Sequence, residues 1–85
     1  MTNKEFIRRL RLAKVEALRL WPDYFCIFKA IRGVFGVNSW GEIGSFGDGT
    51  IWDNDSSGWT SYHAKSPADI ARVFDESIKN LGGKP

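Results

Sequence analysis

The chain has 85 residues, a net charge of +2 at pH 7, 42% hydrophobic residues and 14% aromatic residues. So short a chain buries one core and not two, which predicts a single domain over residues 1–85. A lone cysteine, Cys26, excludes an intramolecular disulfide and a cysteine-based zinc cluster and favours a reducing compartment. The start, Met1–Glu5, leads into a charged stretch, and the longest apolar run, Tyr24–Phe28, is far shorter than the ~20 residues that cross a bilayer. We therefore expect a soluble, cytoplasmic protein.

The charge is unevenly distributed along the chain. Residues 1–21 contain six Lys or Arg against two Glu, a net charge of +4. Residues 38–64 contain no Lys or Arg and four acids, a net charge of −4. This separation predicts a basic amino-terminal surface and an acidic middle of the chain, and charge complementarity of this kind guides association with macromolecules.

The first predicted element is a helix over about residues 3–20. Thr2 followed three residues later by Glu5 is typical of a capping box, in which each side chain accepts a hydrogen bond from a free backbone N–H group. At 100° per residue, the apolar side chains of this segment fall within one arc of about 160°. They are Phe6, Ile7, Leu10, Ala13, Ala17, Leu18, Leu20 and Trp21. Pro22 ends the helix, because the residue before a proline is pushed away from helical geometry.

A second helix is predicted to open at Pro22. Proline suits the first helical position, and Asp23 suits the positive end of the helix dipole. Apolar side chains then recur at spacings of three and four. They are Tyr24, Ile27, Phe28, Ile31, Val34 and Phe35. A strand over 24–31 is an alternative, because residues 25–27 make the run apolar on every side.

Residues 33–58 hold seven of the nine glycines, a density that disfavours long helices. We predict three short strands in and just beyond this region, joined by turn-forming segments in an antiparallel meander. The predicted strands are Ser39–Phe46, Thr50–Asp53 and Trp59–Ala64, and the turns are Gly47–Gly49 and Asn54–Gly58.

The last predicted element is a helix that begins after Ser66. Ser66 is a good cap, Pro67 suits the first position and Asp69 the third. Its apolar face comprises Ile70, Val73, Phe74, Ile78 and Leu81, and Gly82 and Gly83 end the helix. The predicted fold class is therefore α+β, in the order helix, helix, three-stranded antiparallel sheet, helix.

The candidate binding site lies on the first helix. Lys4, Arg8, Arg11 and Arg19 project within about 80° of one another on the helical wheel and form a basic stripe. An ordinary solvated face would account for the cations, but it does not account for Leu12 and Val15, which fall in the same polar arc. Apolar side chains ringed by cations are typical of a docking surface. We name these six residues the docking face.

Other sequence features carry weaker functional hypotheses. Asp53–Gly58 matches the first half of a calcium loop, but its twelfth position is Ala64 where a bidentate Glu is needed. The glycines at 41–49 lack the Gly-Lys-Ser/Thr of a phosphate-binding loop. His63 and Cys26 have no spacing that indicates nucleophilic catalysis. We therefore expect no metal, no cofactor and no enzymatic activity.

Three tryptophans and a tyrosine crowd the predicted sheet. Exposed aromatic side chains can stack bases or anchor a protein interface, whereas a sheet that covers helices needs large side chains on its inner face. They are Trp40, Trp52, Trp59 and Tyr62. Because this segment is acidic, it is a poor nucleic-acid platform, and core packing is the favoured interpretation.

These observations predict a non-catalytic protein that occupies a surface of a partner protein or nucleoprotein through the docking face, with a homodimer as a further option. A nucleic-acid-binding domain that uses the basic first helix is the alternative. In size and in its lack of catalytic motifs the chain is similar to small phage-encoded proteins that block host defences, including anti-CRISPR inhibitors. That resemblance implies obstruction of a nucleic-acid-binding or catalytic surface on a larger assembly.

Overall fold

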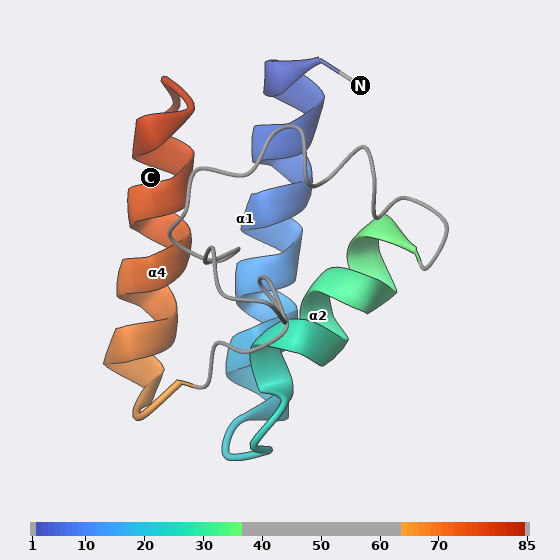
Figure 1. Cartoon of the computed structure of the whole chain (residues 1–85), viewed down its shortest axis with the longest axis vertical. Helices are drawn as coiled ribbons and strands as arrows, with labels where there is room; N and C mark the ends of the chain where they lie inside the picture. Colours follow the sequence, from blue (N-terminus) through green and yellow to red (C-terminus); the bar gives the residue numbers. More distant parts are fainter. Residues whose placement is uncertain (1, 37–63, 85) are drawn as a thin grey trace, which may run out of the picture.

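The computed structural model describes residues 2–36 and 64–84, which form three helices (Figure 1). They are α1 (Asn3–Leu20), α2 (Cys26–Phe35) and α4 (Pro67–Asn80). Helix α1 packs against both α2 and α4. Helix α4 runs antiparallel to α1 (Figure 1). Lys14 pairs with Asp75, whereas Arg11, which comes earlier in α1, donates to the carbonyl oxygen of Lys84, which comes later in the chain.

The starts of α1 and α4 confirm the predicted caps. The Thr2 hydroxyl accepts a hydrogen bond from the Glu5 N–H at 3.2 Å, and the Ser66 hydroxyl accepts one from the Asp69 N–H at 3.0 Å. Each bond satisfies a backbone donor that has no partner within its own helix. The other half of the predicted capping box is absent from this helix start, because the Glu5 carboxylate accepts hydrogen bonds from Arg8 and Arg9 instead.

The end of α4 confirms the predicted glycine stop. Gly82 has a φ of +88°, a conformation that glycine adopts without steric cost. Its N–H group donates to the Lys79 carbonyl and that of Gly83 donates to the Ile78 carbonyl, which is the pattern of a Schellman motif. The turn brings Gly83 against Ile7 of α1, and it places the Lys84 carbonyl within 2.6 Å of Arg11 Nη2.

Residues 26–35 are helical, so the alternative of a strand over 24–31 is wrong. The predicted start at Pro22 is also wrong, because α2 begins at Cys26. The chain turns between the helices instead, and Asp23 holds that turn. Its carboxylate accepts from the Phe25 N–H at 2.8 Å and from Lys29 Nζ at 2.6 Å. Asp23 therefore acts as a turn residue and not as a first-turn helix residue.

The core is built by helix-on-helix packing. Its buried hydrophobic residues are Phe6, Ile7, Leu10, Ala13 and Ala17 from α1, Cys26, Ile27, Ala30, Ile31 and Phe35 from α2, and Ile70, Val73, Phe74 and Ile78 from α4. The rings of Phe6 and Phe35 lie 5.1 Å apart, within the range of a favourable aromatic pair. Two residues predicted on apolar faces, Leu18 and Tyr24, are exposed. Five others are only half-buried: Leu20, Trp21, Phe28, Val34 and Leu81.

The predicted α+β class, with its three-stranded sheet, is contradicted by this architecture. Residues 2–36 and 64–84 form three helices and contain no strand. The physical reason is that the apolar faces of α1, α2 and α4 meet in one core. These faces are buried by the other helices, and not by a sheet as we had predicted. The predicted strands Ser39–Phe46 and Thr50–Asp53 lie outside the described residues, and so do residues 59–63 of the predicted strand Trp59–Ala64. Ala64 is described and does not belong to a strand.

Candidate functional site

The apolar centre of the docking face is exposed in the structure. Leu12 is 50% exposed and Val15 is 67% exposed, whereas the core residues of α1 are at most 8% exposed. Large aliphatic side chains are usually among the most buried in a protein. Both lie on the side of α1 opposite its core residues, because positions 12 and 15 are about half a helical turn from Phe6 and Leu10.

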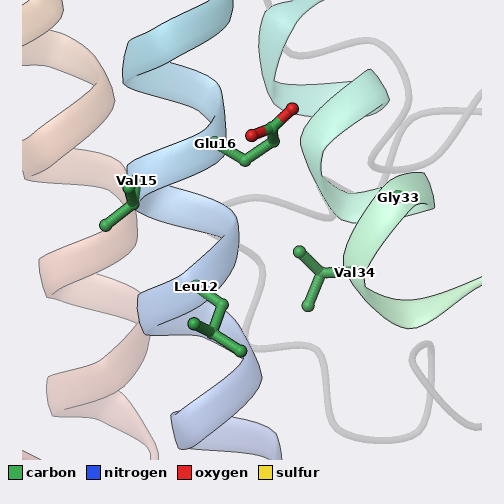
Figure 2. Close-up of a pocket in the computed structure, with 5 residues that line it drawn as sticks. All are labelled: Leu12, Val15, Glu16, Gly33 and Val34. Atoms are coloured by element: carbon green, nitrogen blue, oxygen red, sulfur yellow. The ribbon is translucent and has the colours of Figure 1, made fainter.

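These two residues open onto a pocket between α1 and α2 (Figure 2). The pocket has a volume of about 450 Å³ and is lined by Leu12, Val15, Glu16, Gly33 and Val34. Val34 supplies a third aliphatic side chain from α2, and Glu16 supplies a carboxylate. Sequence reasoning missed the two α2 residues because it had assigned Val34 wholly to the buried face. The signal in the sequence that could have indicated the α2 side of the pocket was Gly33, because an isolated glycine inside a helical pattern often has a packing or functional reason.

Two of the four cations of the docking face are paired with acids of their own helix. Arg8 Nη2 lies 2.6 Å from Glu5 Oε1, and Arg19 forms an ion pair with Glu16. The hydrogen bonds from Arg8 and Arg9 lower the pKa of Glu5 from 4.5 to about 2, and the bond to Glu5 raises the pKa of Arg8. Both pairs join residues three apart, a spacing visible in the sequence that the prediction of the basic stripe did not use.

The other two cations, Lys4 and Arg11, have no acidic partner in residues 2–36 and 64–84. Arg11 Nη2 donates to the Lys84 carbonyl oxygen at 2.6 Å, which orients the guanidinium but leaves it cationic. Lys4 is exposed and has no ion pair among the described residues. The four cations with Glu5 and Glu16 therefore carry a net charge of +2 across the docking face. It is a moderately basic surface around an apolar centre.

Few of the other predicted sites lie in the described residues. The calcium-like loop Asp53–Gly58, the glycines of 41–49, His63 and the aromatic residues 40–62 all lie outside them. Within them, no group of three His, Cys, Asp or Glu side chains could hold a metal ion. Cys26 is buried, and burial raises the pKa of its thiol, as expected for an inert hydrophobe.

No described helix is long and apolar enough to span a membrane. Comparison with known proteins does not assign the chain to a family: no protein-family model, no curated protein and no solved structure matches it significantly. The docking face and the adjacent pocket are therefore interpreted from their own chemistry.

Proposed function

We propose that this chain is a non-catalytic binding protein that acts by occupying a surface of a partner protein or nucleoprotein with its docking face. The observation that carries the proposal is the exposure of Leu12 and Val15 at the mouth of a pocket, amid four cations. A small apolar centre with a charged rim is the usual anatomy of a protein–protein interface. Self-association and capture of a different protein would both use this face.

The two kinds of residue have different roles in this proposal. Burial of Leu12, Val15 and Val34 against a partner removes apolar surface from water and supplies affinity. The cations supply orientation and speed of encounter, since charges at the rim of an interface mainly govern association rate and choice of partner. The pairs of Arg8 and Arg19 are exposed and contribute little to stability, so both arginines can exchange their glutamates for a partner's carboxylates.

A small inhibitor of the kind that phages encode against host defences would work in this way. Such a protein needs only a surface that competes with a natural ligand, and it needs no chemistry of its own. The mildly basic sequence pI of about 8.9 and the similarity in size support this class as a proposal.

The decisive experiment measures partner capture by the purified chain and by Val15→Asp. Affinity purification from the native host identifies the partner, and the affinity is then measured with both components purified. We expect Val15→Asp to weaken binding by about tenfold or more, because it desolvates a carboxylate at the interface centre. Tyr24→Asp is the matched control, since Tyr24 is 63% exposed and lies outside the docking face and the pocket. Equal binding by both variants and the wild type would contradict the proposal.

A nucleic-acid-binding domain is the second candidate. It is favoured by one observation: all twelve Lys and Arg residues lie in residues 2–36 and 64–84, where they outnumber six acids. Binding to phosphates would weaken steeply with salt, because each neutralised phosphate releases counterions. Gel shifts at rising salt, with Arg11→Glu and Lys4→Glu as variants, test this candidate. A protein partner held by Leu12 and Val15 shows no such steep loss.

A further inference from the structure

Gly33 occupies a position that does not require glycine for any reason inside the described fold. It is the eighth of the ten residues of α2, and a Cβ atom added there would meet nothing within 4 Å. Its backbone does not have a positive φ, unlike that of Gly36 and Gly82. Glycine in a helix is less stable than alanine, because its backbone loses more conformational freedom on folding.

The other described glycines differ in this respect. Gly36 and Gly82 have φ angles of +84° and +88°, and a Cβ at Gly83 would lie 2.9 Å from two isoleucine side chains. For those three positions the fold itself explains the glycine. Gly33 instead lines the pocket with Leu12, Val15, Glu16 and Val34 (Figure 2). A bare backbone at the wall of an open pocket favours the close approach of something from outside the described fold.

We propose that the occupant of this pocket is an amphipathic helix of an acidic partner protein, packed between α1 and α2 with its backbone close to Gly33. The proposal rests on the proposed function and names the partner's chemistry. Two adjacent helices form a groove into which the side-chain ridge of a third helix fits, and a small residue in the groove lets the helix axes approach. An apolar ridge on this helix would contact Leu12, Val15 and Val34.

The charges around the pocket favour carboxylates on the flanks of that helix. Arg8, Arg11 and Arg19 flank Leu12 and Val15 on α1. Arg8 is paired with Glu5, and Arg19 is paired with Glu16, which lines the pocket, so Arg11 is the one of these three without an acidic partner in the described residues. A second copy of α1 is a poor occupant. If two copies paired about Leu12 and Val15, Arg8 would face Arg8 or Arg19 of the other copy in either helix direction. Like charges placed opposite one another disfavour such an interface.

The test uses two synthetic helical peptides as long as α1. Both carry leucines at spacings of three and four; the flanks are glutamate in one and lysine in the other. We expect the glutamate peptide to bind at least about tenfold more tightly than the lysine peptide and to shift the Gly33 amide resonance in an NMR titration. No binding of the glutamate peptide, or equal binding of the two peptides, overturns the proposal.

Gly33→Ala separates this inference from the proposed function. The variant should have a melting temperature raised by about 2–8 °C and yet bind the glutamate peptide at least about tenfold more weakly. Lys79→Ala, on the exposed side of α4, is the control and should bind normally. If Val15→Asp abolishes binding while Gly33→Ala does not weaken it, the docking face stands and close approach at Gly33 is refuted. If neither variant changes binding, both proposals fail.

Discussion

Substitution of Gly83 by alanine should destabilise the fold by an amount that follows from the packing of the carboxyl-terminal segment. The new methyl group would lie 2.9 Å from Ile7 Cδ1, 2.9 Å from Ile78 Cγ2 and 3.1 Å from Ile7 Cγ2. Carbon atoms in contact prefer about 3.5–4.0 Å, so the methyl would overlap each of these atoms by roughly 0.4–1.1 Å. Overpacking of this kind costs about 1–3 kcal/mol. We expect about 1–2 kcal/mol, because Ile7 Cδ1 is the far end of a flexible side chain and can shift.

Urea unfolding of wild type, Gly83→Ala, Ile7→Val and the double variant measures this effect. Ile7→Val removes one of the overlapping carbon atoms, so it should cost less in the Gly83→Ala background than in the wild type, with a coupling energy of about 0.5–1 kcal/mol. Movement of the segment would also break the bond from the Gly83 N–H to the Ile78 carbonyl, which faster amide exchange at Gly83 would report. A neutral Gly83→Ala, or strictly additive variants, would refute the described packing of this segment against α1.

Three further outcomes are expected. Ser77→Ala should raise the free energy of unfolding by about 0.5–1 kcal/mol, because the Ser77 hydroxyl is buried without a hydrogen-bond partner among residues 2–36 and 64–84. A lower melting temperature of the variant would show that the hydroxyl has a partner. The pKa of Glu5 is lowered to about 2, so its solvent-exposed bonds to Arg8 and Arg9 make a small contribution to stability above its usual pKa of 4.5, which is lost as the pH falls from about 4.5 towards 2. Acid denaturation of Glu5→Gln should lack this part of the slope, and an unchanged profile would contradict the pairing. Cys26 should react slowly with a thiol reagent until denaturant is added, since the thiol is buried and its pKa is raised, and rapid reaction of the native protein would contradict its burial.

The elements that could be predicted from the sequence are those whose signals are local. The bounds of α1 and α4 follow from Thr2, Ser66 and Pro67 at their starts and from Gly82 at the end of α4, because caps and stops depend on neighbouring residues. Helical periodicity likewise identified the core residues of both helices. The exposure of Leu12 and Val15 was predictable for the same reason, since the face of a helix is determined by its phase.

The features that needed the tertiary structure depend on contacts between segments distant in the chain. Periodicity could not decide between helix and strand for residues 24–31, because that run is apolar on every side and only packing against α1 favours one face. The predicted α+β class failed for a related reason: local patterns do not reveal that the apolar faces of α1, α2 and α4 cover one another.

The docking face shows the same division. Its six residues could be placed together from the phase of one helix, whereas the pocket needs α2, whose Gly33 and Val34 follow Val15 by eighteen residues or more and meet it only in the fold. The bond from Arg11 to the Lys84 carbonyl joins residues 73 positions apart in the sequence. Local sequence determined which side chains α1 presents, and the tertiary structure decided what lies beside them, because helix phase is a property of one segment and a pocket is a property of two.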